Sequence, residues 1–185
     1  MTDALILPER VVDGDDLVIR CWTLDDADAL AAAVTESVEH LRPWMAWIEL
    51  EPVAIADRRT HIEEWAEQWC AGGSAVYGIW LDGRVAGGTG LHHRGVPATL
   101  EIGYWLHPSF VGRGLITRVA RVLTDTALTV PGIDAVEIHH DVANVRSAAV
   151  PERLGYRRLD DVDHQGHAAW RIERDQWLGG AGQAS

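Results

Sequence analysis

A glycine-rich turn near the middle of the sequence has the residue types that bind phosphate. Gly112-Arg113-Gly114 follows an apolar stretch that ends at Leu106 and precedes a segment with helical periodicity. The first turn of a helix presents unpaired N–H groups and the positive end of the helix dipole, and glycines let a phosphate approach the backbone. The turn therefore predicts an anion site. An ordinary two-glycine turn is the alternative, and neither a Rossmann nor a Walker pattern is present.

A second polar group lies further along the chain, at the start of another predicted helix. Asn144 can cap this helix, Ser147 lies one turn in, and Gly155 ends it. Pro151 has no N–H group and would leave the Ser147 carbonyl without its usual helical partner. The pattern indicates a capped helix that is distorted beside a serine. A capped, broken surface helix without a ligand is the alternative interpretation.

The elements that position these residues follow from hydrophobic periodicity. The order is strand, helix, helix, three strands, helix, strand, helix, strand, and Asp82-Gly83 between two apolar runs is a hairpin signal. Such an order is typical of an α/β domain with a mixed sheet. The expected strands are 17–22, 75–81, 84–92, 100–106, 135–140 and 168–173. The expected helices are 24–38, one between Asp57 and Gly72, 114–130 and 145–154.

Composition excludes several classes of function. The formal net charge is −12 and no run of basic residues occurs, which argues against nucleic acid as a partner. No apolar run approaches the ~20 residues of a membrane span, and the two cysteines have neither disulfide nor metal-ligand spacing. We therefore expect a cytoplasmic protein. The nine tryptophans, against three tyrosines and one phenylalanine, suggest an aromatic cleft or a homodimer surface, with core packing as the alternative.

At these residues the chain resembles the GNAT superfamily of acyl-CoA-dependent N-acyltransferases, and within it the branch of the ribosomal-protein serine/alanine N-terminal acetyltransferases. Three segments carry the resemblance: EIGYWLHPSFVGRGLIT from Glu101, NVRSAAVPERLGY from Asn144, and LRPWM from Leu41. The first two segments, at this distance and in this order of elements, make it specific over residues 17–173. It implies an enzyme that transfers an acetyl group from acetyl-CoA to a primary amine by direct attack in a ternary complex.

The resemblance also implies a fold. We expect an α/β structure, a single GNAT-type domain whose mixed, splayed central sheet has about six or seven strands and about four flanking helices. This domain would occupy residues 1–178, and residues 179–185 would form a flexible tail. The strands that end at Leu106 and near His140 would diverge, and the acyl-pantetheine arm would lie between them. No metal is implied, and no spacing of His, Cys, Asp and Glu indicates one.

In this fold the turn after Leu106 would hold coenzyme A. The resemblance implies that backbone N–H groups of the turn bind the pyrophosphate and that main-chain groups around Trp105 and Leu106 pair with the pantetheine amides. Asn144 would hold the pantetheine, and Ser147 would lie near the thioester sulfur. The full set of expected coenzyme A residues is Trp105, Leu106, His107, Val111, Gly112, Arg113, Gly114, Leu115, Ile116, Thr117, Asn144 and Ser147.

Two positions of the turn depart from the family pattern. Val111 stands where the family has Gln, Arg or an aromatic residue, and Ile116 replaces a small Gly or Ala. Backbone donors do not depend on the type of side chain, so we expect coenzyme A to bind. The departures leave open a protein of another class, a coenzyme A-binding sensor without catalysis.

Acyl transfer to an amine requires a deprotonated nucleophile and a protonated leaving thiolate. An α-amino group titrates near ~8 and a lysine amine near ~10.4, so a base is useful at neutral pH. Glu101 matches a strand glutamate of other family members and is the expected base. His139, on the facing strand, is the second candidate, and an outward-facing strand residue is the alternative for each. Ser147 lies in the helix where many members carry a tyrosine, and it is expected to protonate the thiolate.

The acceptor site is the part that the sequence specifies least. LRPWM resembles the loop that shapes the family's acceptor pocket, so we expect the acceptor to bind among Trp44, Trp47 and Trp80. Tryptophans packed between the helices and the sheet are the alternative. The acceptor could be a protein N-terminal α-amine or a small amine such as a polyamine or an antibiotic. A cation near Arg94 or Arg146 would also admit a succinyl group.

Overall fold

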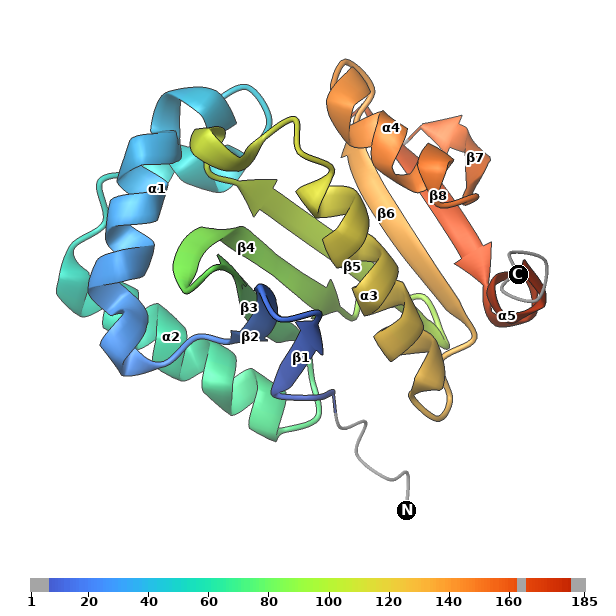
Figure 1. Cartoon of the computed structure of the whole chain (residues 1–185), viewed down its shortest axis with the longest axis horizontal. Helices are drawn as coiled ribbons and strands as arrows, with labels where there is room; N and C mark the ends of the chain where they lie inside the picture. Colours follow the sequence, from blue (N-terminus) through green and yellow to red (C-terminus); the bar gives the residue numbers. More distant parts are fainter. Residues whose placement is uncertain (1–6, 163–165, 181–185) are drawn as a thin grey trace.

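A computed structural model describes residues 7–162 and 166–180. Its central feature is an eight-stranded sheet with the order β1-β2-β3-β4-β5-β6-β8-β7. Neighbouring strands are antiparallel except β5 and β6, which run parallel. The mixed sheet and the single α/β domain are thus confirmed (Figure 1). The strands are β1 (Arg10–Asp13), β2 (Leu17–Cys21), β3 (Ala75–Leu81), β4 (Arg84–His92), β5 (Thr99–Leu106), β6 (Ala135–Asp141), β7 (Arg157–Val162) and β8 (His167–Glu173).

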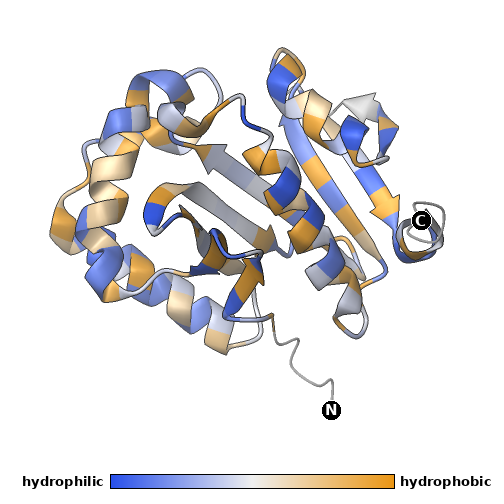
Figure 2. Cartoon of the chain, viewed as in Figure 1, coloured by the Kyte–Doolittle hydropathy of each residue, from blue (hydrophilic) through white to orange (hydrophobic). Residues whose placement is uncertain are grey.

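Helices cover both faces of this sheet. One hydrophobic cluster joins the sheet to α3, and a second joins its other face to α1 and α2. Figure 2 shows hydrophobic and hydrophilic residues alternating along α3, as expected of a helix with one buried face. The α-helices are α1 (Ala27–Leu41), α2 (Ile55–Cys70), α3 (Leu115–Thr129), α4 (Val145–Arg153) and α5 (Arg174–Gly180). Short 3-10 turns occupy Leu24–Asp26, Ala46–Leu50 and Pro108–Phe110.

Local sequence signals explain several of these boundaries. Asp82 and Gly83 have φ angles of 50° and 73°, the left-handed values that a tight hairpin between β3 and β4 requires. Thr23 and Asp26 form a reciprocal capping box in which the Thr23 N–H donates to Asp26 Oδ2 at 2.8 Å. The helix expected from residue 24 thus opens with a 3-10 turn and continues as α1 to Leu41.

The sheet splits between β5 and β6. The two strands pair only over Thr99–Glu101 and Ala135–Glu137. Beyond these residues β5 continues to Leu106 beside β4, and β6 continues to Asp141 beside β8. The strands therefore diverge, which confirms the predicted splay, and α4 lies beside the open end of β6 (Figure 1).

The described chain has more elements than the sequence predicted. Strands β1 and β7 lie at the two edges of the sheet, where β7 reads RRLDDV and shows no apolar alternation. The short helix α5 was also missed, and it includes Gly179 and Gly180 of the expected tail. Residues 181–185 of that tail lie outside the described residues. Among the described residues no helix is long and apolar enough to cross a membrane.

Candidate active site

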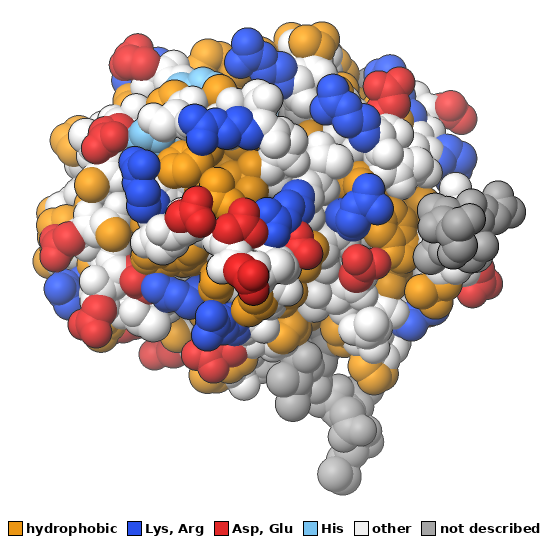
Figure 3. Space-filling model, viewed as in Figure 1, with side chains coloured by type: hydrophobic (Ala, Val, Ile, Leu, Met, Phe, Trp, Pro, Cys, Tyr) orange, Lys and Arg blue, Asp and Glu red, His pale blue; other side chains and the backbone are white. Residues whose placement is uncertain are grey.

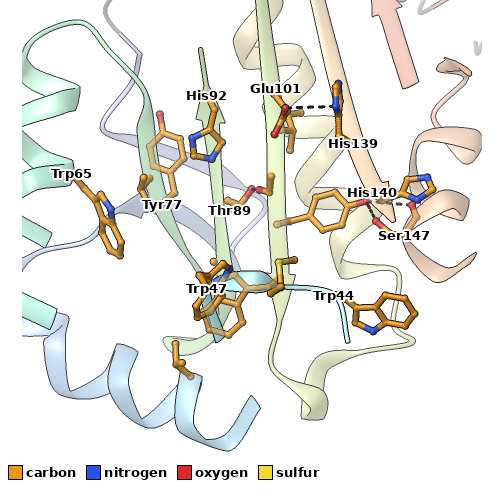
Figure 4. A pocket seen from close by; sticks show the side chains of 18 of the residues that line it. Trp44, Trp47, Trp65, Tyr77, Thr89, His92, Glu101, His139, His140 and Ser147 are labelled. Atoms are coloured by element: carbon orange, nitrogen blue, oxygen red, sulfur yellow. Dashed lines mark hydrogen bonds and ion pairs between the residues drawn. The ribbon is translucent and has the colours of Figure 1, made fainter. Parts of the chain in front are cut away.

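A cavity of about 830 Å³ opens at the split in the sheet. It brings together residues from β4, β5, β6, the start of α4 and the segment before α2. Figure 4 shows Glu101 and His139 on facing strands, with the tryptophans around another part of the cavity. The sequence-predicted residues that line it are Trp44, Trp47, Glu101, Trp105, His139, Asn144 and Ser147.

Glu101 and His139 face each other across the narrow end of the split. Glu101 Oε2 lies 3.9 Å from His139 Nδ1, and Glu101 Oε1 lies 3.3 Å from Arg94 Nε. On its other side, His139 Nε2 lies 2.8 Å from a Glu137 oxygen. Glu101 and Glu137 are register partners, so the parallel pairing itself places both carboxylates beside the imidazole.

Glu137 is a largely buried carboxylate that the sequence analysis did not single out. Hydrogen bonds from His139 and Arg171 outweigh the effect of burial and hold the pKa of Glu137 below its usual range. An ionised carboxylate only accepts hydrogen bonds, so His139 Nε2 carries a hydrogen in this pairing. Glu137 thereby fixes the orientation of the His139 ring.

Two further histidines line the cavity. His140 Nδ1 lies 2.8 Å from the Asp141 carbonyl, and His140 Nε2 accepts from Trp170 Nε1 at 2.9 Å, so both nitrogens are engaged. Burial lowers the pKa of His92, which favours a neutral ring at pH 7. His139, in contrast, lies between two carboxylates, Glu101 of the cavity and the largely buried Glu137.

Ser147 lies in the first turn of α4. Its N–H donates to Asn144 Oδ1 at 3.1 Å, which confirms Asn144 as the N-cap. Ser147 Oγ lies 2.9 Å from the Tyr104 hydroxyl of β5, and the same hydroxyl lies 3.3 Å from the Ser147 carbonyl. Pro151 is inside the helix, so this carbonyl lacks its helical donor and accepts from Tyr104 instead.

The cavity has a compartment with tryptophan walls. Trp44 and Trp47 come from the segment before α2, Trp65 from α2 and Trp105 from β5, and all four line the cavity. Trp47 and Trp105 meet edge to face with ring centroids 6.1 Å apart. The Trp105 indole covers Gly88, whose position would place any Cβ 2.4 Å from Trp105 Nε1.

Trp80 does not line this cavity. Its ring centroid lies 5.7 Å from that of Trp22, and the Arg20 guanidinium stacks on it at 4.2 Å. Trp22 does line the cavity, so Trp80 supports the tryptophan compartment through a neighbour. Its contribution is to packing between the sheet and the first helices.

A buried ion pair holds the wall of the same compartment. Arg58 Nη2 lies 2.7 Å from Glu51 Oε1, and the two side chains are only 6% and 4% exposed. Glu51 also accepts from the Val53 N–H at 3.0 Å. Both charged residues line the cavity, so this pair fixes the start of α2 against the segment that carries Trp44 and Trp47.

The predicted phosphate turn lies outside the cavity, between β5 and α3. Gly112 and Gly114 have φ angles of 76° and 72°, and a Cβ added at either position would meet no atom within 4 Å, so the turn is open to solvent. Arg118 makes the first helical bond, to the Gly114 carbonyl at 3.1 Å. The N–H groups of Leu115, Ile116 and Thr117 therefore precede the helical ladder and can bind an anion.

The side chains of this turn serve packing more than binding. Val111 and Ile116 are half-buried and both pack against the main hydrophobic cluster. His107 Nδ1 accepts from the Ser109 N–H, and its Nε2 lies 2.9 Å from Glu36 of α1. Arg113 is exposed over the Phe110 ring, and Figure 3 shows basic and acidic side chains interspersed on this face.

The edge of β5 offers main-chain groups to the split. The His107 N–H donates to the Ala86 carbonyl at 2.9 Å, so His107 faces β4. Main-chain groups alternate in direction along a strand, which turns those of Tyr104 and Leu106 toward the gap. The edge therefore suits a ligand that carries amides, at Leu106 rather than at Trp105.

Sequence reasoning missed two residues that line the cavity, Tyr104 and Trp65, and also Glu137, which contacts the lining residue His139. Trp65 lies in the helix that was expected between Asp57 and Gly72, and its residue type alone does not distinguish a lining residue from a core residue. Glu137 carries a signal, because a charged residue at a buried strand position commonly has a partner. Tyr104 gave no such signal, since a tyrosine in an apolar strand looks like core. Among the described residues no group of three or more His, Cys, Asp or Glu side chains could hold a metal ion.

Comparisons with known proteins agree with this geometry. The acetyltransferase (GNAT) domain model matches residues 16–157. The "Putative ribosomal N-acetyltransferase YdaF" of Bacillus subtilis (strain 168) is 32% identical over 143 residues, which cover 77% of this chain and 78% of that protein. A crystal structure described as a probable acetyltransferase superposes with a TM-score of 0.83 at 28% identity and covers 91% of this chain and 98% of its own. RimL, a ribosomal L7/L12 alpha-N-protein acetyltransferase in complex with coenzyme A, has a TM-score of 0.79 at 19% identity, with coverages of 89% and 98%.

Proposed function

Because the chain belongs to the GNAT acetyltransferase family and is an acetyl-CoA-dependent N-acetyltransferase, we propose that its acceptor is the α-amine of a protein N-terminus. The relatives named for ribosomal-protein acetylation support this acceptor. The observation that carries the proposal is the cavity itself. It joins a carboxylate, an imidazole and a serine hydroxyl at the split to an aromatic compartment large enough for a residue that follows the amine.

The donor would bind along the opposite side of the split. The open N–H groups at the start of α3 suit the pyrophosphate, and Arg113 adds a cation. The strand edge at Leu106 suits the pantetheine amides, and Asn144 and Ser147 would lie beside the thioester. Val111 and Ile116 pack against the hydrophobic cluster and leave these backbone N–H groups accessible. This packing favours coenzyme A binding despite the two departures from the family pattern.

The proposed reaction is direct attack of the amine on the thioester. The amine gives up its proton to Glu101 as the nitrogen–carbon bond forms. The carbon–sulfur bond then breaks, and the electron pair left on sulfur takes a proton from Ser147. Solvent removes the proton from Glu101 and returns one to Ser147, so the balance closes. His139, held by Glu137, is the alternative base because its ring lies between the two carboxylates.

A second candidate acceptor is a small amine with a bulky apolar or aromatic body. The tryptophan compartment favours it, because Trp47, Trp65 and Trp105 offer more aromatic surface than a serine or alanine side chain can fill. An acidic acyl donor is less suited, since Arg94 is paired with Glu101 in this cavity. We also propose a cytoplasmic location, from the cysteine usage, and a homodimer, from the tryptophan content.

The decisive experiment is acetyl transfer from acetyl-CoA to a matched panel of acceptors. It would compare peptides that begin with Ser or Ala, the same peptides with a blocked α-amine and an internal lysine, polyamines, and aromatic amines. Thiol release gives the rate and mass spectrometry gives the modified atom. We expect modification of the free α-amine and none of the blocked peptide. All 16 basic side chains are arginines, so the enzyme itself offers no lysine that could consume acetyl groups.

Other outcomes would overturn specific parts of the proposal. Turnover confined to the aromatic amines would replace the peptide acceptor with the small-amine acceptor. Turnover of the internal lysine in preference to the α-amine would contradict N-terminal specificity. A shift in melting temperature with coenzyme A tests donor binding separately, because a ligand that binds only the native state stabilises it.

A further inference from the structure

The contact between Tyr104 and Ser147 joins two elements that approach each other only in the folded chain. Tyr104 belongs to β5 and Ser147 to α4, on opposite sides of the split. Their oxygens are 2.9 Å apart, a normal hydroxyl–hydroxyl hydrogen bond. Both residues line the cavity, so this bond lies where the thioester would be held.

Each hydroxyl carries a single hydrogen, which limits what this pair can do. The Tyr104 hydrogen has two acceptors on the same residue, Ser147 Oγ at 2.9 Å and the Ser147 carbonyl at 3.3 Å. The carbonyl is available because Pro151 supplies no N–H in the next turn of α4. Both acceptors therefore draw the phenolic hydrogen toward Ser147.

The Tyr104 hydroxyl stays protonated, so it can act as a hydrogen-bond donor at all times. Burial raises the pKa of Tyr104 to about 12, so its hydroxyl keeps its hydrogen throughout the working pH range. A phenol that stays protonated can always donate to Ser147. The serine hydroxyl, which then acts as the acceptor in this pair, keeps its own hydrogen for a third partner in the cavity.

We propose that Tyr104 is a positioning residue for the acetyl transfer: it donates to Ser147 Oγ and so directs the serine hydrogen toward the leaving sulfur. The same bond stabilises the negative charge that develops on Oγ as its proton moves to the thiolate. The inference rests on the proposed role of Ser147 and gives a role to Tyr104, which the sequence analysis quoted within the segment from Glu101 without assigning it one. Tyr104 itself transfers no proton to substrate.

The test is a double-mutant cycle of Tyr104→Phe and Ser147→Ala, measured with whichever amine the wild-type enzyme acetylates. We expect Tyr104→Phe to lower kcat roughly tenfold or more, with little change in the KM for acetyl-CoA. In the Ser147→Ala background, the same substitution should have no further effect, because the group that it positions is absent. The pH profile should keep its shape, since Tyr104 does not titrate in the assay range.

A matched control separates positioning from stability. Tyr156 is also a buried tyrosine whose hydroxyl bonds another hydroxyl, Thr124 Oγ1 at 2.6 Å, and it does not line the cavity. Tyr156→Phe should lower the melting temperature by a similar amount and leave kcat unchanged. An equal loss of kcat in both variants would reduce the Tyr104 effect to stability and overturn the proposal.

The remaining outcomes distinguish this inference from the proposed reaction. A wild-type or increased kcat in Tyr104→Phe would show that Tyr104 does not direct the serine hydrogen, while a loss in Ser147→Ala would still support the serine as acid. Loss in Tyr104→Phe with a wild-type rate in Ser147→Ala would remove both the serine role and the positioning role. Multiplying losses in the double variant would show that the two residues act separately.

Discussion

The proposed donor and acceptor sides of the split differ in whether backbone or side chains form them. The proposed donor side consists mainly of backbone: the turn at Gly112 and Gly114, the N-terminal N–H groups of α3, the edge of β5 and the cap at Asn144. The proposed acceptor side consists of large side chains from distant segments, the tryptophans and the buried Glu51–Arg58 pair, all of which line the cavity. A backbone site tolerates changes of side chain, whereas a side-chain site depends on each residue that forms it.

The packing of Val111 and Ile116 illustrates the difference. Both depart from the family pattern, yet both side chains lie against the core and leave the N–H groups of the turn in place. On the acceptor side, a change such as a larger residue at Gly88 would meet Trp105 at once, because the Cβ would lie 2.4 Å from the indole nitrogen. Donor binding should therefore vary little among relatives, and acceptor choice should vary widely.

The largest expected effect is on stability at the acceptor side. Glu51→Gln leaves the Arg58 charge buried without a carboxylate, which should lower the free energy of unfolding by about 3–5 kcal/mol. Urea unfolding measures it. The double variant Glu51→Gln/Arg58→Met, which removes both charges, should recover most of the loss. Equal destabilisation in the single and double variants would show that the pair is not the cause.

The next effect is on catalysis at the junction of the two sides. Glu101→Gln removes the proposed base and should lower kcat about a hundredfold, with an unchanged KM for acetyl-CoA. Glu152→Gln, an exposed carboxylate of α4, is the control and should keep the wild-type rate. If Glu101→Gln retains the rate and His139→Ala loses it, the base is the histidine.

A smaller effect tests the backbone character of the donor side. Gly114→Ala forces a residue with a Cβ into a left-handed conformation, at a cost of about 1–2 kcal/mol, and should weaken coenzyme A binding in calorimetry. Gly132→Ala is a close match, since Gly132 has a φ of 82° and equally open surroundings. It should lose similar stability and keep its affinity. Equal affinities in both variants would argue against the turn as the pyrophosphate site.

The smallest effect concerns the acid limb of stability. Because its pKa in the folded state is lowered, Glu137 contributes stability that is present above its unfolded pKa of ~4.3 and is lost as pH falls through the lower folded value. Glu137→Gln should therefore have a shallower loss of unfolding free energy below about pH 4.3. Denaturant titrations at several pH values measure the slope, and identical slopes would contradict the pairing with His139 and Arg171.

The same difference between backbone features and side-chain contacts decided how much of the fold and of the candidate site could be predicted from the sequence. The hairpin at Asp82-Gly83, the cap at Asn144 and the missing N–H donor at Pro151 are local features, and each could be predicted from the residue types. The edge strands β1 and β7 were not, because an edge strand can be short or charged and still pair on one side. Trp80 was expected to line the cavity, and it does pack in the cluster on that face of the sheet, but next to Trp22, which lines the cavity in its place. Alternation along a strand predicts the face of a side chain and not which neighbour covers it.

The sequence by itself determined the backbone of the proposed donor site. Glycines with positive φ, an N-cap and a proline set the backbone conformation within a few residues of themselves. Their effect therefore does not depend on contacts with distant parts of the chain. Only the tertiary structure decided which side chains meet across the split. Glu101 reaches His139 through the register of two parallel strands, and Tyr104 reaches Ser147 because those strands then diverge and admit α4. Such meetings depend on contacts between residues far apart in the chain, which no local pattern records.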